Sequence, residues 1–367
     1  MTSVVTVEID FAALRHNLQQ VRKAAPDAKV IAVIKANAYG HGLLRVASVL
    51  QQAGAEAFAV ARLNEALQLR EAGITCPILC LEGFLNSHEL DELAAHDLQV
   101  VVHHVSHVEL LERHLLSKPI TAWLKIDSGM HRLGVSPQSV LELWQRLKQC
   151  KSVKTLKLMT HLASADDRNS EQTRQQIKLF NETVAGIATE ITIANSAGIL
   201  GWAQSHGQWV RPGIMLYGVS PFINGRGESE GLQPVMTLTS HLIAVNHFKK
   251  GDAIGYGASW VCPEDMAIGV VACGYGDGYP RHAVPGTPVI INGQRLPLVG
   301  RVSMDTLCVD LHTAPNTHIG DAVTLWGKGL PVEEIAESAS TIPYELLCGV
   351  TGRVQVDVIN CSSRDLI

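Results

Sequence analysis

An alternation of short apolar runs with amphipathic stretches dominates the first two-thirds of the chain. The apolar runs occupy residues 30–35, 57–61, 77–81, 98–102, 120–127, 156–161, 191–195 and 210–216. The segments between them carry apolar residues at three- and four-residue spacing with charges interspersed, which predicts helices between buried strands. Repeated strand–helix units of this number predict an α/β protein with a (β/α)8 barrel of the TIM type.

The sequence changes character after residues 218–229, a stretch rich in turn formers that we interpret as a linker. Beyond it, Gly, Pro and Asp turns separate β-rich segments, and only two segments have helical spacing. The β-rich segments are 235–245, 266–273, 288–291, 296–299, 306–309, 322–325 and 354–358, and the helical ones are 332–339 and 344–347. We therefore expect a barrel over residues 10–230 and a mostly antiparallel β-strand domain over 231–367, which residues 1–9 join.

Composition narrows the classes of function. The chain has 367 residues, of which 46% are hydrophobic and 18% charged, so a globular protein of two domains is expected. A net charge of −5 without a basic stripe argues against nucleic acid or an anionic membrane as a partner. No apolar run is long enough to cross a bilayer, and the N-terminal segment lacks the pattern of a secretion signal.

Cysteines and histidines give two further expectations. The eight cysteines form no CxxC pair, which favours reduced thiols in the cytoplasm. The histidines of the segment 103–107 have no cysteine or carboxylate at ligand spacing, so we interpret them as solvated loop residues and expect no metal site.

Unusual polar residues follow the ends of the predicted barrel strands. They are Lys35, Tyr39, Lys125, Arg132, His161, Ser196 and Arg211. Barrel enzymes place catalytic groups at this face and often bind phosphate near the last two strands. The Gly213 and Ile214 amides and the Ser196 hydroxyl are candidates for a phosphate cradle. A lysine in a partly apolar pocket can lose its proton and form an imine with a carbonyl compound.

Six segments carry a specific resemblance. IKANAYGHG (34–42), LKIDSGMHRLG (124–134), RPGIMLYG (211–218), GYGASW (255–260), GYGDGYPR (274–281) and GRVSMD (300–305) resemble segments of the alanine racemases. They occur in the family's order and span nearly the whole chain. The resemblance implies a pyridoxal 5'-phosphate (PLP) enzyme that interconverts L- and D-alanine.

The same resemblance implies roles for individual residues. Lys35 would hold PLP covalently, and Arg211 would face its pyridine nitrogen. Arg132 would bind the phenolic oxygen of the cofactor and the substrate carboxylate, and Lys125 matches a lysine that the family can carbamylate. The remaining cofactor contacts would come from Tyr39, His161, Ser196, Gly213, Ile214 and Tyr344.

Racemisation needs a proton removed from one face of Cα and one delivered to the other. The resemblance gives these tasks to Lys35 and to Tyr256, the latter contributed by the other subunit of a head-to-tail homodimer. His161 would bond to that tyrosine and bias it toward ionisation. Met304 would contact the substrate carboxylate, and Tyr275 and Arg281 would narrow the entrance.

Two other functions remain compatible with the residues. A PLP-dependent decarboxylase of the same architecture would be expected to carry an acidic residue in place of Arg211. A non-catalytic PLP carrier would need only the barrel. Within the racemase interpretation, the sequence is compatible with D-alanine supply for peptidoglycan and with alanine catabolism.

Overall fold

The computed structural model describes residues 4–361, which fall into two compact units. One unit contains residues 15–216 and 221–225, and the other contains residues 4–14, 217–220 and 226–361. Among the helices of this described part, none is long and apolar enough to span a membrane.

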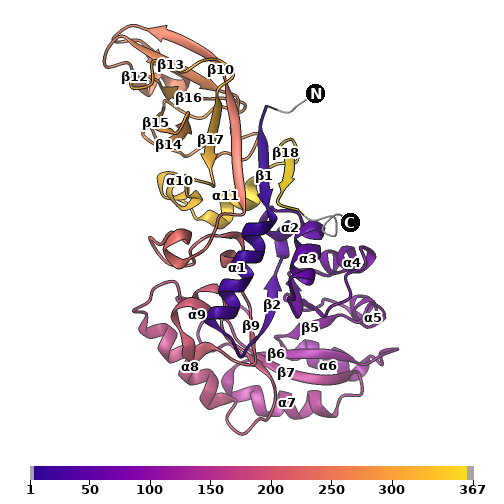
Figure 1. The fold of residues 1–367 in the computed structure, drawn as a ribbon. Helices are drawn as coiled ribbons and strands as arrows, with labels where there is room; N and C mark the ends of the chain where they lie inside the picture. The colour runs from indigo at the N-terminus through magenta and orange to yellow at the C-terminus, as the bar shows by residue number, and fades with distance from the viewer. Residues whose placement is uncertain (1–3, 362–367) are drawn as a thin grey trace. The chain divides into compact units, whose positions relative to one another are not determined.

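The first unit is a closed parallel barrel (Figure 1). Its strands are β2 (Lys29–Val33), β3 (Ala57–Val60), β4 (Ile78–Cys80), β5 (Gln99–Val102), β6 (Ile120–Lys125), β7 (Val153–Met159), β8 (Ile191–Thr192) and β9 (Trp209–Val210). Each strand pairs with the next, and β2 pairs with β9 to close the ring. The predicted (β/α)8 barrel is therefore confirmed.

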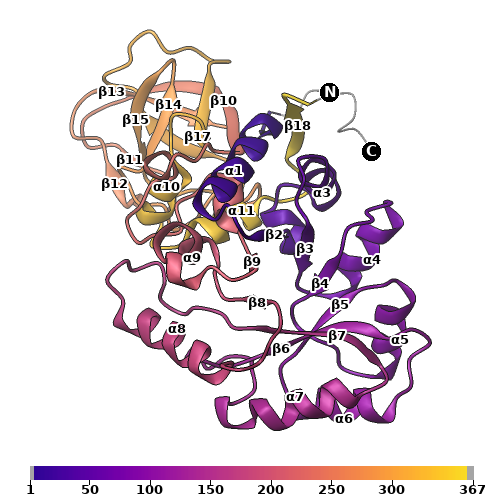
Figure 2. The same cartoon turned by 60° about the horizontal axis from the view of Figure 1, so that its bottom comes forward.

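The barrel strands are buried on both faces, which explains why they read as continuous apolar runs. Every residue of β3, β4 and β6 is buried. The covering helices are α3 (Leu43–Gln52), α4 (Leu63–Glu71), α5 (Ser87–Ala95), α6 (Val105–Arg113), α7 (Val140–Gln149) and α8 (Glu171–Thr183). Figure 2 shows these helices around the outside of the strands. In α7, the buried Val140, Leu143, Trp144 and Leu147 repeat at helical spacing.

The last two barrel strands are shorter than predicted, so the chain leaves the barrel early at the face that bears the candidate residues. The predicted strand 191–195 ends at Thr192, because Asn195 caps helix α9 (Ser196–Gly201) by accepting a hydrogen bond from the Gly198 amide. The predicted strand 210–216 ends at Val210. Pro212 has no N–H for a ladder, and residues Ile214–Tyr217 form a short 3-10 helix.

The second unit is mostly antiparallel, as predicted. Its sheet contains β1 (Thr6–Asp10), β10 (Met236–Phe248), β13 (Met266–Val271), β14 (Pro288–Ile291), β15 (Gln294–Val299), β16 (Leu307–Asp310), β17 (Ala322–Trp326) and β18 (Gln355–Ile359). Strand β13 pairs with both β16 and β10, so six of the strands close on themselves. Strand β1 pairs with β10 and with β18.

The segment interpreted as a linker is ordered by a buried carboxylate. Glu333 of α10 (Val332–Ser338) accepts hydrogen bonds from the Ser220 amide at 3.1 Å and the Gly227 amide at 2.8 Å. Arg226 forms a two-pronged ion pair with Glu337 one turn further along the same helix. These contacts make residues 218–229 a folded connection rather than a loose linker.

Candidate active site

Lys35 opens a strained turn at the end of the first barrel strand. Strand β2 ends at Val33, so the prediction that the strand continues to Lys35 is wrong; the lysine begins the short helix α2 (Lys35–Tyr39). Ala36, Asn37 and Ala38 have φ angles of 53°, 54° and 53°, in the left-handed region that non-glycine residues avoid. Such a run persists only where neighbouring contacts over-determine it, and these conformations concentrate at functional sites.

Two side chains fix this turn. Glu65 accepts a hydrogen bond from the Ala36 amide at 2.6 Å, and the Asn37 side chain accepts one from the Leu43 amide at 2.8 Å. The half-buried Lys35 is therefore held on backbone tied to two of the covering helices.

A small polar cradle joins the ends of β2, β8 and β9. The Ser196 hydroxyl accepts hydrogen bonds from the Gly213 amide at 2.9 Å and the Met215 amide at 3.3 Å. Tyr39 is buried beside them, and a Cβ at position 213 would lie 2.6 Å from its hydroxyl oxygen. Only glycine allows this approach, and Ile214 follows directly. The cradle supplies the hydroxyl and amide groups that suit a phosphate.

Arg211 is buried in a cage of neutral acceptors. Its guanidinium donates to the Thr192 hydroxyl at 2.7 Å and to the Thr160 and Ile193 carbonyls at 2.7 and 3.2 Å. Burial lowers the pKa of Arg211 to about 10. No carboxylate pairs with it in the part of the chain that the structure describes.

His161 is a neutral acceptor next to this arginine. Its Nδ1 lies 3.3 Å from Nη2 of Arg211, which can only donate. Burial, followed by the charges of Arg211 and Lys125, lowers the pKa of His161 well below its ordinary value. With Nδ1 accepting, the ring proton sits on Nε2, where it is free to be donated.

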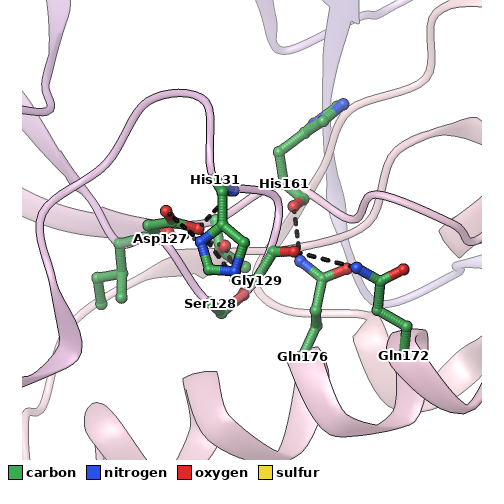
Figure 3. Close-up of polar contacts among 9 residues, drawn as sticks. Asp127, Ser128, Gly129, His131, His161, Gln172 and Gln176 are labelled. Carbon is green, nitrogen blue, oxygen red and sulfur yellow. Dashed lines mark hydrogen bonds and ion pairs between the residues drawn. The ribbon is translucent and has the colours of Figure 1, made fainter.

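Lys125 and Arg132 lie before and after a tight loop. The Lys125 side chain is buried, and burial together with the charges of Arg211 and Arg132 lowers its pKa to about 8. In the loop, Asp127 accepts hydrogen bonds from the Gly129 and His131 amides, each at 3.0 Å (Figure 3). This self-capped turn presents Arg132 at its exposed end.

The barrel site is consequently cationic. Lys35, Lys125, Arg132 and Arg211 all contribute electrostatically to the lowered pKa of His161. Such a cluster favours ligands with phosphate and carboxylate groups. No group of His, Cys, Asp and Glu within residues 4–361 has the arrangement to hold a metal ion.

Of the histidines of the segment 103–107, His104 is exposed as expected and His103 is half-buried. His107 is buried rather than solvated, with its ring 4.4 Å from those of Phe84 and His103. Burial lowers the pKa of His107 to about 4. His107, a residue of helix α6 (Val105–Arg113), therefore belongs to the packing.

The remaining predicted residues lie in the β-strand unit, and they are exposed. Tyr256 occupies a turn between β11 (Ala253–Ile254) and β12 (Trp260–Val261), where Gly255 and Gly257 have φ angles of 75° and 73°. It is thus a turn residue. Its side chain is 69% exposed, against 54% for Met304 and 38% for Tyr344. This hairpin was not among the predicted strands, although the two glycines flanking Tyr256 signal a turn.

Two loops of this unit are locked together. The Tyr275 amide donates to the Ser303 carbonyl at 3.0 Å, and the Gly276 amide donates to the Met304 carbonyl at 2.8 Å. Arg353 bridges the same loops through ion pairs with Asp277 at 2.9 Å and Asp305 at 2.8 Å. Arg353 was missed in the sequence because it lies far along the chain from both loops and outside every recognised segment.

A (β/α)8 barrel with a cationic site at its strand ends, followed by a β-strand domain, defines a two-domain enzyme of the α/β class. The chain belongs to the alanine racemase family: the model of the family's N-terminal domain matches residues 9–221 and that of the C-terminal domain matches residues 235–358. By family it is an isomerase of the amino-acid racemase class. The resemblance seen in the six segments is confirmed.

Relatives and solved structures agree with this assignment. The alanine racemase of Nitrosococcus oceani is 54% identical over 347 residues, covering 94% of this chain and 97% of the relative. That of Shewanella amazonensis is 51% identical, covering 95% and 97%. The structure of the biosynthetic alanine racemase from Pseudomonas aeruginosa matches with a TM-score of 0.95 and 41% identity, over 97% of this chain and 99% of that one.

Proposed function

We propose that this protein is a PLP-dependent alanine racemase that interconverts L- and D-alanine. The observation that carries the proposal is the assembly of Lys35, the Ser196–Gly213 cradle and the uncompensated Arg211 at the same end of one barrel. The cradle suits a phosphate ester, and the lysine suits an aldehyde. Because Arg211 is held by neutral acceptors, its positive charge is not compensated. This charge suits a neighbouring ring nitrogen that must stay unprotonated.

The residues present fit that cofactor. Lys35 would hold it through the ε-nitrogen, and Tyr39, Ser196, Gly213, Ile214 and Tyr344 would bind its phosphate. When bound, PLP supplies an electron sink that makes the Cα proton of an amino acid acidic. The chain's own groups then bind the substrate, set the protonation of the ring and carry protons.

Arg211 would set the strength of this sink. A carboxylate opposite a pyridine nitrogen favours its protonated form, whereas a buried guanidinium disfavours it. A neutral ring withdraws charge less strongly, which limits side reactions such as transamination. This favours racemisation over the decarboxylase alternative, which would be expected to carry an acidic residue at this position.

Two groups would carry the protons. The ε-amine of Lys35 would serve one face of Cα, and the phenol of Tyr256 of the partner subunit would serve the other. A free tyrosine has a pKa of about 10, so it needs a neighbour that favours ionisation. His161 has the Nε2 proton to donate to that phenolate, because Arg211 occupies its Nδ1.

Arg132 would bind the substrate carboxylate, together with the Met304 backbone of the partner subunit. Lys125, with its lowered pKa, is suited to carbamylation, because the neutral amine is the form that reacts with carbon dioxide. The carbamate would turn a buried cation into an anion facing Arg132.

A head-to-tail homodimer accounts for the exposure of Tyr256, Met304 and Tyr344. Aromatic residues and methionine are enriched in the cores of protein interfaces. A two-fold dimer makes both sites equivalent, each completed by the other subunit. We further propose a cytoplasmic location, with D-alanine supplied for peptidoglycan or L-alanine released for catabolism.

Subunit complementation tests the shared site. The variants Lys35→Ala and Tyr256→Phe are each expected to be inactive alone as homodimers. In a mixed dimer, the site with an intact Lys35 receives Tyr256 from the Lys35→Ala subunit and is therefore wild type. A randomised equimolar mixture should recover about one quarter of the parental activity, since half the dimers are mixed and each has one intact site.

The measurement is D-alanine formation from L-alanine with PLP, before and after subunit exchange. Parental protein that forms no D-alanine would overturn the racemase assignment, and carbon dioxide release from a diamino acid would favour the decarboxylase instead. Absence of any turnover with retained PLP would favour the carrier. If the parental protein is active but the mixture of variants recovers no activity, Lys35 and Tyr256 of each site belong to the same subunit.

A further inference from the structure

Helix α8 carries two glutamines that contact the backbone at the ends of β6 and β7 (Figure 3). Gln172 and Gln176 are one helical turn apart, so their side chains project from the same side of the helix. Neither belongs to the six segments that relate the chain to its family.

Gln176 is 1% exposed and uses both ends of its amide. Its Oε1 accepts a hydrogen bond from the Ala163 amide at 2.9 Å, and its Nε2 donates to the His161 carbonyl at 3.2 Å. It also packs beneath the loop that carries Arg132, because a Cβ at Gly129 would lie 3.1 Å from its Cγ. Gln176 therefore touches both strand ends at once.

Gln172 makes a second connection between the same two segments. Its Nε2 donates to the Gly129 carbonyl at 3.2 Å, while its Oε1 accepts from the Ser164 hydroxyl at 2.7 Å. Near the start of the loop, the Ser128 and Thr160 hydroxyls are 2.8 Å apart and form a third connection. All three connections therefore reach the loop at the adjacent residues Ser128 and Gly129.

Helix packing alone does not explain a glutamine at position 176. The buried side of α8 also includes Thr173, Ile177 and Phe180, so position 176 lies where an apolar residue is expected. A buried amide costs stability unless both of its ends are hydrogen-bonded. The two bonds of Gln176 go to backbone within two residues of His161, not to the helix itself.

We propose that Gln172 and Gln176 are positioning residues, which fix the Arg132 loop against the strand end that carries His161. This inference rests on the proposed function, in which Arg132 binds the substrate carboxylate and His161 bonds to the catalytic tyrosine. The pair couples the two sides of the substrate site, so loosening it displaces Arg132 relative to His161.

The test compares Gln176→Leu and Gln172→Ala with Gln175→Leu, each as the full-length holoenzyme. Gln175 lies on the exposed side of the same helix and provides the matched control. Steady-state kinetics with L-alanine gives kcat and KM, and hydrogen–deuterium exchange of residues 126–135 reports loop order with and without PLP. In this stretch, the Gly129 and His131 amides donate to the Asp127 carboxylate, and the Asp127 amide donates to the Val135 carbonyl.

Gln176→Leu should lower kcat/KM by about 10- to 100-fold, because small misplacements of a binding group have effects of that order. Gln172→Ala should act in the same direction by several-fold, mainly through KM, since it removes only the bond to the Gly129 carbonyl and leaves the contacts of Gln176 intact. Both should speed exchange in residues 126–135, whereas Gln175→Leu should change neither quantity.

Unchanged exchange in residues 126–135, or faster exchange with unchanged kinetics, would overturn the positioning role. If Gln176→Leu does not fold, the exposed Gln172→Ala decides by the same two readouts. Parental protein without racemase activity would refute the proposed function alone, and the exchange comparison would still decide whether the glutamines order the loop.

Discussion

The barrel and the β-strand unit contribute to the proposed site in opposite ways. In the barrel, Arg211 and Lys125 are buried, and burial lowers the pKa of each. In the β-strand unit, Tyr256 and Met304 are more than half exposed and lie on turns. The barrel residues of the proposed site are therefore assembled within one unit, while those of the β-strand unit lie at its surface.

The difference follows from what each half has to do. Electrostatic control of a cofactor needs groups removed from water, where charges act strongly. A group donated to another subunit must instead stay accessible in the single chain and become buried on assembly. In the proposed dimer, the exposed residues of the β-strand unit would form half of an interface. Substitutions should separate the buried residues from the exposed ones.

The largest effects are expected from the two proton carriers, and they should differ in kind. Lys35→Ala should lower racemisation by on the order of 10⁴-fold and also remove the visible absorption of lysine-bound PLP. Tyr256→Phe should lower kcat by about 10²- to 10⁴-fold while absorption and Tm stay close to parental, because the change keeps the ring and leaves the lysine that holds the cofactor intact. Loss of cofactor absorption in Tyr256→Phe would contradict the division of roles.

The fold was largely predictable because its signals are local. Runs such as 57–61 and 120–127 are continuously apolar, as strands buried on both faces must be. The ends of β8 and β9 were not predictable to the residue. There, the apolar pattern continues but the strands end. Asn195 begins a helix by accepting a hydrogen bond from a backbone amide, and Pro212 has no backbone N–H to donate.

The site was predictable only where residue type and position in the barrel coincide. Lys35 and Arg211 follow strand ends and belong to recognised segments, and Ser196 follows a strand end. Gln176 and Arg353 do not, since their contacts come from tertiary packing between segments distant in sequence. The left-handed turn at Ala36–Ala38 was equally hidden, because alanine does not favour that conformation.

A charge reversal at Arg211 probes the buried half directly. Arg211→Glu should lower racemisation by about 10- to 100-fold and raise the share of transamination, because a carboxylate favours a protonated ring nitrogen. The change also leaves the Thr160 and Ile193 carbonyls without their donor, so Tm should fall. Pyruvate formed per racemisation event is the measurement.

Arg211→Gln is the matched control, since it keeps a donor but carries no charge. It should lose activity without the increase in pyruvate. Equal pyruvate formation in both variants would assign the effect to lost hydrogen bonds rather than to the charge.

Lys125 tests the energetic consequence of a buried cation. Its pKa falls to about 8 in the folded chain, from an ordinary value near 10.5, so the unfolded chain binds more protons between these two values. Stability therefore rises with pH across that window, and the full penalty is present below pH 8. Lys125→Met removes the charge at similar volume and should raise the Tm of PLP-free protein at pH 7 in buffer free of carbon dioxide.

The gain in Tm should shrink as pH rises from 8 toward 10.5, where the parental lysine becomes neutral in both states. Thermal unfolding of parent and variant at several pH values measures it. A variant no more stable than the parent at pH 7 would mean that another group compensates the Lys125 charge.

The smallest effect is expected at Asp127. As a partly exposed residue of the barrel, it is intermediate between the buried barrel residues and the exposed residues of the β-strand unit. Burial raises the pKa of its carboxyl, but bonds from the His131 and Gly129 amides and the His131 ring outweigh this and lower it overall. A lowered carboxyl pKa gives stability that is present above the ordinary value near 3.8 and is lost as pH falls through the folded-state value.

Asp127→Asn keeps an acceptor oxygen but loses the charge, and exposure limits the cost to less than about 1 kcal/mol. Amide exchange of residues 129–131 should therefore be slightly faster in the variant at pH 7, and the difference should disappear once the pH is low enough to protonate the parental carboxyl. A difference that persists unchanged at that low pH would show that the shape of the side chain, and not its charge, orders the loop before Arg132.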